Sequence, residues 1–189
     1  MQPIFTIHAG EYLIASLIEN RFKEYDVWVP SKDRGVDLLI TNPANKKMMG
    51  LQVKFSKDWL ATSRDWAGRI AEDLKGGLKS CGWWQFGRDK LRKSPADLWI
   101  LVSYGLTSES IQYVVIKPKE LLKRLINLRG NIETINTYLW TDSNNKCWET
   151  RALKKGDRLL IAKGKYSNPD RDFTRYLNDW NAMRKFLGS

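Results

Sequence analysis

Two short apolar stretches separated by a turn constrain the fold of this chain more than any other feature. Residues 35–40 and 50–55 are rich in β-branched and other apolar side chains, and residues 42–47 between them are typical of a turn. The pattern predicts a β-hairpin. Successive side chains of a strand point to opposite faces, so Gln52 and Lys54 share one face, and antiparallel pairing brings Asp37 close to them.

A carboxylate, an amide oxygen and an ammonium group on one face are suited to a hydrolytic metal site. Carboxylate and amide oxygens bind a magnesium-like ion, and a lysine orients water or stabilises a charged transition state. Glu11 lies in the first turn of a helix that the apolar spacing predicts over residues 11–22. The helix dipole alone explains a glutamate there, but together with Asp37 it becomes a candidate metal ligand. The alternative is an ordinary solvated hairpin face.

The order of these motifs resembles the PD-(D/E)XK nuclease superfamily over residues 8–118. A helix with Glu11 comes first, then a strand with Asp37, then a strand with Gln52-Val53-Lys54. Val36 stands at the place of the eponymous proline, and Gln52 at the place of the acidic residue, as in the Mrr-like branches that carry QXK. The resemblance implies an α/β fold with a restriction-endonuclease-like αβββαβ core.

The resemblance also implies a metal-dependent site. Mg²⁺, with Mn²⁺ as its substitute, would be bound by Asp37, Glu11, the Gln52 side-chain oxygen and the Val53 carbonyl. Lys54 would position or deprotonate the attacking water. A glutamine offers only a neutral oxygen, so Gln52→Glu is expected to tighten metal binding.

The remaining pattern predicts a mixed sheet in a single domain over residues 1–189. The core, about 8–130, takes further strands at 25–29, 96–104 and 111–116, a helix within the tryptophan-rich segment 56–88, and a helix after Pro118. A basic, helical C-terminal extension, about 131–189, follows. Residues 158–162 are predicted as a short strand, and residues 172–187 as a terminal helix packed on the domain.

The charge of the chain indicates a polyanionic partner. The net charge is +11, and residues 46–93 and 117–165 each carry 12 basic and 5 acidic residues. Nucleic acid is the first candidate, with solubility alone as the alternative. Tryptophans 59, 66, 83 and 84 are interleaved with basic residues, and at least half of them are expected in the core. The predicted contacts to the nucleic-acid backbone are Lys75, Lys79, Arg88, Lys90, Arg92 and Lys93.

The two cysteines and the hydropathy of the chain indicate the cellular compartment in which the protein is expected. Cys81 and Cys147 are isolated, which predicts buried thiols in a reducing environment and argues against a zinc site. The sequence contains no apolar run of membrane-spanning length and no signal-peptide pattern. We therefore expect a cytoplasmic protein without a membrane partner.

These observations predict a magnesium-dependent DNA endonuclease of the restriction, junction-resolving or repair type. Two alternatives stay open: a nucleic-acid-binding module of the same fold with weak or no catalysis, and an RNA-directed nuclease, because charge alone does not distinguish the two polymers. The oligomeric state is also open, and a homodimer is compatible with the sequence.

Overall fold

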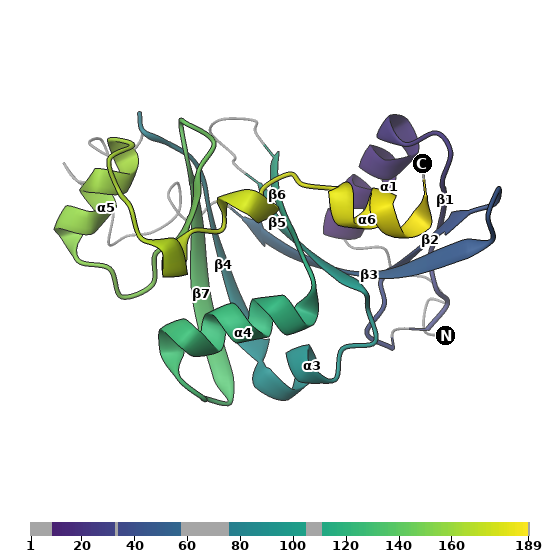
Figure 1. Ribbon diagram of the computed structural model, residues 1–189, viewed down its shortest axis with the longest axis horizontal. Helices are drawn as coiled ribbons and strands as arrows, with labels where there is room; N and C mark the ends of the chain where they lie inside the picture. Colours follow the sequence, from purple (N-terminus) through teal and green to yellow (C-terminus); the bar gives the residue numbers. More distant parts are fainter. Residues whose placement is uncertain (1–8, 33, 58–75, 105–110, 189) are drawn as a thin grey trace.

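The fold is mixed α/β, with two sheets and several helices (Figure 1). The computed structural model describes residues 9–32, 34–57, 76–104 and 111–188. The helices are α1 (Ala9–Arg21), α3 (Arg88–Arg92), α4 (Pro118–Arg129), α5 (Lys155–Ala162) and α6 (Asn181–Leu187). The strands are β1 (Asp26–Trp28), β2 (Leu38–Asn42), β3 (Lys47–Lys57), β4 (Leu78–Gly87), β5 (Leu98–Tyr104), β6 (Ile111–Ile116), β7 (Thr134–Asp142) and β8 (Cys147–Glu149).

The larger sheet contains the predicted hairpin. Its strand order is β1-β2-β3-β5-β6, with β3 and β5 parallel and the other neighbours antiparallel. Leu38 lies opposite Leu51, so the register places Asp37 opposite Gln52, as the sequence predicts. The continuous apolar run of β5 lies inside the sheet and is buried on both faces, which is typical of a strand paired in parallel.

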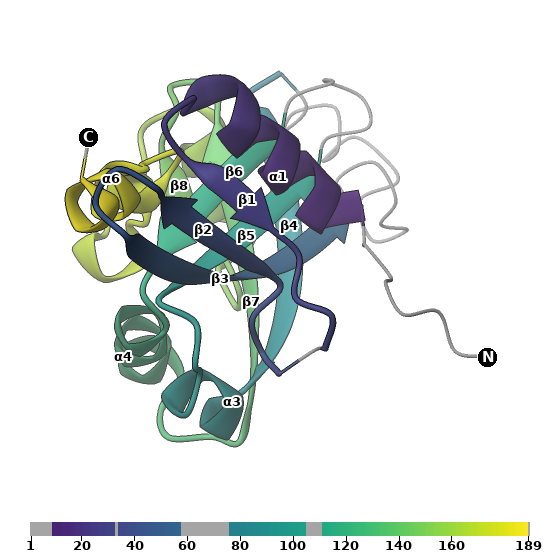
Figure 2. The same ribbon diagram turned by 90° about the vertical axis from the view of Figure 1, so that its right-hand side faces the viewer.

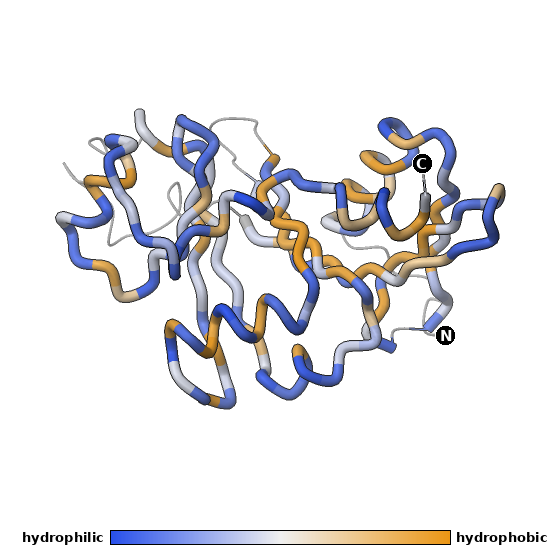
Figure 3. The backbone as a smooth tube through the Cα atoms, in the orientation of Figure 1, coloured by the Kyte–Doolittle hydropathy of each residue, from blue (hydrophilic) through white to orange (hydrophobic). Residues whose placement is uncertain are grey.

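Helices cover both faces of this sheet. In Figures 1 and 2, α1 and α6 lie on one side of it, and α3 and α4 lie on the other. The α1 side is closed by one hydrophobic core, which takes side chains from α1, α6 and strands β2, β3 and β5. A second core on the other side joins β5, β6 and α4 to the smaller sheet. Figure 3 shows hydrophobic residues concentrated along the central strands.

The smaller sheet, β4-β7-β8, changes the expected organisation of the C-terminal part. β4 precedes β5 in the chain, yet it pairs with β7 from beyond residue 131. The extension predicted as helical therefore also contributes two strands, and it shares a sheet with the core. Residues 158–162 were predicted as a strand and lie instead in helix α5, where Ile161 packs into a third core against the smaller sheet.

The predicted helix over residues 172–187 is shorter than expected. Single 3-10 turns occupy Pro169–Arg171 and Thr174–Tyr176, and only Asn181–Leu187 is α-helical. Leu177 forms a β-bridge with Val114, and the Asn178 side chain accepts a hydrogen bond from the Tyr113 N–H. Asn178 itself adopts a left-handed conformation with φ of 53°. These contacts with β6 keep the chain extended where its periodicity favours a helix.

The two cysteines behave as predicted. Both are free and buried, Cys81 in the core beneath α5 and Cys147 in the core shared by the two sheets. Burial raises the pKa of the Cys147 thiol to about 12, so this thiol stays protonated at neutral pH. In the described part of the chain, no helix combines the length and the apolar character needed to cross a membrane.

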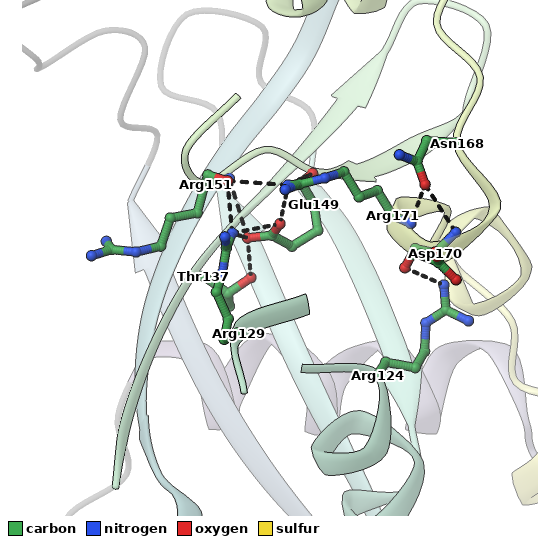
Figure 4. Close-up of polar contacts among 8 residues, drawn as sticks. All are labelled: Arg124, Arg129, Thr137, Glu149, Arg151, Asn168, Asp170 and Arg171. Atoms are coloured by element: carbon green, nitrogen blue, oxygen red, sulfur yellow. Dashed lines mark hydrogen bonds and ion pairs between the residues drawn. The ribbon is translucent and has the colours of Figure 1, made fainter. Parts of the chain in front are cut away.

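A buried ion cluster fastens the C-terminal segment to the smaller sheet (Figure 4). The Glu149 carboxylate is fully buried, and it accepts hydrogen bonds from Arg129 at 2.6 Å and from Arg171 at 2.7 Å. The Thr137 hydroxyl also donates to it, at 3.2 Å. One carboxylate on β8 thus holds a guanidinium at the end of α4 and another from the 3-10 turn at 169–171.

We expect Glu149→Ala to lower the free energy of unfolding by about 3–5 kcal/mol, because it leaves two buried guanidinium groups without their counter-ion. Chemical denaturation measures the loss. Glu133→Ala, which removes an exposed carboxylate just before β7, is the matched control and should change stability little. An equal effect of the two substitutions would show that the cluster does not fasten this segment.

Candidate functional site

Asp37 lies just before β2 and is hydrogen-bonded to β3, so it extends the β2–β3 pairing by one residue. Its main-chain N–H donates to the Leu51 carbonyl at 2.8 Å, and its carboxylate Oδ2 accepts the Val53 N–H at 2.7 Å. The β2–β3 ladder begins only at Leu38 and Leu51, so the carboxylate takes the place of a strand partner for Val53. Asp37 is therefore fixed at the edge of β3 by the backbone of that strand.

The Gln52 side chain also binds this carboxylate. It is buried, and its amide Nε2 donates a hydrogen bond to Asp37 Oδ2. The sequence predicts Gln52 as an oxygen ligand of a metal, whereas here its nitrogen faces Asp37. The geometry therefore gives Gln52 a direct structural role, which is to hold the orientation of the Asp37 side chain.

Lys54 lies on the same face of β3, two residues after Gln52. Its main-chain carbonyl accepts a hydrogen bond from the Trp84 indole at 2.9 Å, and its Nζ lies 5.8 Å from the centre of the Trp99 ring. An ammonium group at that distance over an indole is attracted by the ring. The backbone of Lys54 is therefore fixed by an aromatic side chain of β4, and its charge is directed along the face of β5.

Gln52 and Lys54 line a cleft of about 740 Å³. The cleft lies where β3 and β5 meet β4 and the short helix α3. Two of the predicted nucleic-acid contacts, Lys90 of α3 and Lys93 just after this helix, line it together with Asp89. Its other lining residues are Gly35, Gln85, Phe86, Gly87, Ser94, Pro95, Trp99 and Thr134.

The other predicted contacts to nucleic acid do not line this cleft. The Lys79 ammonium donates to the Asn145 side chain at 2.6 Å, near the opposite end of β4. Arg88 donates to Asn131 at 2.8 Å, and Arg92 forms an ion pair of 3.1 Å with Asp89. Lys75 lies outside the described residues. The structure thus places Lys90 and Lys93 in the lining of the cleft, Arg88 and Arg92 beside it through their ion pairs with Asp89, and Lys79 at the far end of β4.

Glu11 lies on the helix that packs against the opposite face of β3. Its neighbour Gly10 packs so closely on Phe55 that a β-carbon there would come within 2.8 Å of the Phe55 Cβ. The side chains of Leu51 and Val53 point to the same side, into the core under α1. The structure therefore joins Asp37 to Gln52 by a hydrogen bond and places the helix that carries Glu11 on the other side of β3, and the role of Glu11 as a metal ligand stays a prediction.

The donors around Asp37 are compatible with a magnesium-like ion. Both hydrogen bonds to the carboxylate fall on Oδ2, and a carboxylate has about four lone-pair sites, so these bonds do not exhaust its capacity. The Val53 carbonyl points to the same side of β3 as the Val53 N–H, which is the Asp37 side. Mg²⁺ is commonly bound by one or two carboxylates plus water and substrate phosphate. Among the described residues, no three His, Cys, Asp or Glu side chains form a metal-binding group.

The tryptophans separate into core and surface residues. Trp84 and Trp99 are buried in the core between the two sheets, whereas Trp83 is half-buried. Trp28 is 58% exposed on β1, and Trp59 and Trp66 lie outside the described residues. Of the four tryptophans of which at least half are expected in the core, one is thus buried, one is half-buried and two are outside the described residues, so the expectation stays a prediction.

Some residues of the cleft escape sequence reasoning. Gln85 and Thr134 lie on paired strands that are far apart in the chain, and Trp99 reads simply as part of an apolar strand. Asp89 stands inside a basic run, which offers a weak signal. Comparisons of this chain with protein-family models, with curated proteins and with solved structures found no match.

The hydrogen bond from Gln52 to Asp37 makes a testable prediction. Gln52→Glu would place two carboxylates side by side, and one of them must then take up a proton or a cation. In EDTA at pH 8, we expect the variant to unfold with a free energy about 1–3 kcal/mol lower than the wild type. The difference should shrink as the pH falls to 5, where protonation relieves the repulsion, and on addition of Mg²⁺. Chemical denaturation under these conditions measures it.

Gln85→Glu is the control, because the Gln85 amide faces Asn136 rather than a carboxylate. It should show no such loss at pH 8. Equal stability of Gln52→Glu and the wild type in EDTA at pH 8 would mean that the Gln52 amide does not hold Asp37.

Proposed function

We propose that this protein is a metal-dependent phosphodiesterase that cleaves DNA as an endonuclease. The observation that carries the proposal is the cleft itself. Gln52 and Lys54 line it, and the Gln52 amide is hydrogen-bonded to the Asp37 carboxylate. Lys90 of α3 and Lys93, the residue that caps this helix, line it as well. The motif predicted for catalysis and two residues predicted for backbone binding were derived from separate parts of the sequence, and they meet in one place.

Each residue of the proposed site would have a distinct task. Asp37 and the main-chain carbonyl of Val53 would hold Mg²⁺, or Mn²⁺ in its place, and the bound ion would polarise the scissile phosphate and lower the pKa of a water molecule. The Gln52 amide keeps the Asp37 carboxylate in orientation. Lys54 would orient the attacking water and stabilise the negative charge that develops on the phosphate. Lys90 and Lys93 would bind the neighbouring phosphates of the strand.

The wider arrangement supports the same proposal. A helix, strands with the Asp37 and Gln52-Val53-Lys54 motifs, and a mixed sheet are what a restriction-endonuclease-like core requires, and we assign the chain to that fold as part of the proposal. The buried free thiols of Cys81 and Cys147 agree with a reducing compartment such as the cytoplasm. A homodimer is compatible with an endonuclease that cuts both strands.

A binding module without catalysis is the second candidate. It is favoured by the two N–H groups that Asp37 Oδ2 accepts, because such a carboxylate also serves as a purely structural link between β2 and β3. The two candidates differ in one measurable property, which is whether phosphodiester bonds are cut when a divalent metal is present.

We expect Lys54→Ala and Asp37→Asn each to reduce cleavage by at least about 100-fold, because each removes a charge at the reacting phosphate. The assay uses supercoiled, linear, branched and single-stranded DNA, and matching RNA, with Mg²⁺, Mn²⁺ or EDTA. Lys47→Ala, on the same strand but away from the cleft, and Asp26→Asn, on β1, are the matched controls. Both controls should cut at the wild-type rate.

The outcomes separate the candidates. Wild-type protein that binds these substrates but cuts none of them with either metal would support the binding module. Cleavage that survives both Lys54→Ala and Asp37→Asn would place the chemistry elsewhere in the chain. Cleavage of RNA but not of DNA would support the proposed site and identify RNA as the substrate.

Binding should depend on the lysines that line the cleft more than on basic residues outside it. We expect Lys90→Ala with Lys93→Ala to weaken DNA binding and to reduce the slope of log K against log[salt] by about two, because two phosphate contacts are lost. The control pair Lys47→Ala with Lys79→Ala removes the same charge at positions that do not line the cleft. Fluorescence anisotropy over a range of salt concentrations measures both pairs, and equal losses would mean that total charge, not the cleft, governs binding.

A further inference from the structure

The smaller sheet presents matched pairs of aromatic and amide side chains on one face. Trp83 lies opposite Tyr138 in the β4–β7 register, and Gln85 lies opposite Asn136. The two rings lie 6.5 Å apart, and the Gln85 amide donates to the Asn136 oxygen at 3.2 Å. Directly opposed residues point to the same face, and residues two apart along a strand do so as well. The four side chains therefore lie side by side on a single surface.

This surface is continuous with the cleft. Gln85, Gly87 and Thr134 belong to the same face of the sheet, and all three line the cleft. At the other end the face is covered by α5, where Trp140 is buried in the core with Ile161. The aromatic pair lies between these two ends and is half-buried, and Gln85 is exposed.

Two hydrogen bonds connect the strand that carries Trp83 to β3, which carries the proposed catalytic residues. The Trp83 main-chain N–H donates to the Ser56 hydroxyl of β3 at 2.9 Å. The next residue, Trp84, points to the other face, into the core, and its indole N–H donates a hydrogen bond to the Lys54 carbonyl. The aromatic pair thus has a fixed position relative to Lys54 without needing a loop to order it.

We propose that the surface formed by Trp83, Tyr138, Gln85 and Asn136 binds the bases of a single nucleic-acid strand that leaves the cleft. The inference rests on the proposed function, because it takes the cleft as the place where the phosphate backbone is bound. Bases would stack on the aromatic pair, and the two amides, which both donate and accept, would bind base edges with little sequence preference.

The chemistry favours a single strand over a duplex. In a duplex the base faces are stacked on one another inside the helix, so aromatic side chains beside the backbone gain nothing from stacking. The lysines of the cleft suit the phosphate backbone of one unpaired strand, and the adjoining aromatic and amide surface suits its bases. Free ends, flaps and junction arms provide such strands, in DNA and in RNA.

The test compares two replacements of Trp83. Trp83→Leu keeps an apolar side chain but removes the ring, and Trp83→Phe keeps a ring. We expect Trp83→Leu to weaken binding of a labelled single-stranded DNA or RNA oligonucleotide by about 5- to 100-fold, the range expected for one lost stacking contact. Trp83→Phe should retain most of the affinity, and binding of blunt duplex should change little for either variant. Fluorescence anisotropy at fixed salt measures the affinity of the wild type and of both variants for single strands and for duplex.

Trp28→Leu is the matched control, because it removes an exposed tryptophan from β1, away from this surface. Gln85→Ala gives a second variant on an exposed position in case Trp83→Leu folds poorly, and it should also weaken single-strand binding selectively. Comparison of the affinities for DNA and RNA oligonucleotides identifies which polymer the surface binds.

The outcomes distinguish this inference from the proposed function. Wild-type affinity of Trp83→Leu or of Gln85→Ala for single strands would overturn the inference, even if the protein cleaves DNA as proposed. An equal loss for single strands and duplex would overturn it as well. Single-strand binding that depends on Trp83, in a protein that cuts no substrate with either metal, would support the inference and refute the nuclease.

Discussion

Strand β3 has two different neighbours, and the arrangement of the site depends on that change of partner. Over its first half β3 is paired antiparallel with β2, and from Leu51 onward it is paired in parallel with β5. β2 begins only at Leu38, so the second half of β3 has no regular strand on its β2 side. The Asp37 carboxylate occupies that side by accepting the Val53 N–H. The position of an acidic group is thereby set by backbone pairing rather than by a flexible loop.

The alternation of side chains along β3 separates residues of the core from residues that line the cleft. Leu51 and Val53 point into the core under α1, and Gln52 and Lys54 point to the opposite side, toward β4 and the cleft. A shift of register by one residue would exchange the two sets, exposing apolar groups and burying an ammonium. The core on the α1 side therefore fixes the orientation of the polar residues without any contact of its own with the cleft.

The parts of the fold that the sequence predicts correctly depend on local signals. The hairpin, the buried strand β5 and helix α4 with its proline at the start follow from periodicity and turn chemistry. The β4–β7 pairing escapes prediction because its partners lie far apart in the chain, from 47 positions for Gly87 and Thr134 to 64 for Leu78 and Asp142, and no local pattern encodes such a partner. Helix α5 was predicted as a strand because a short apolar run fits either structure, and its packing against the smaller sheet decides the outcome. Asp37, Gln52 and Lys54 could be brought together from the sequence because they share one hairpin, whereas Gln85 and Thr134 could not.

Some of the basic residues have structural roles and are not simply charges on the surface. In the C-terminal basic block several arginines hold the fold: Arg124 donates to main-chain carbonyls at Pro169, Asp170 and Asp172, and Arg129 binds Glu149. A guanidinium presents several donors in a fixed plane, which suits such bridging, whereas an ammonium is a compact point charge on a flexible stem. The cations that line the cleft are lysines. The net charge of +11 therefore includes cations whose hydrogen bonds and ion pairs stabilise the fold.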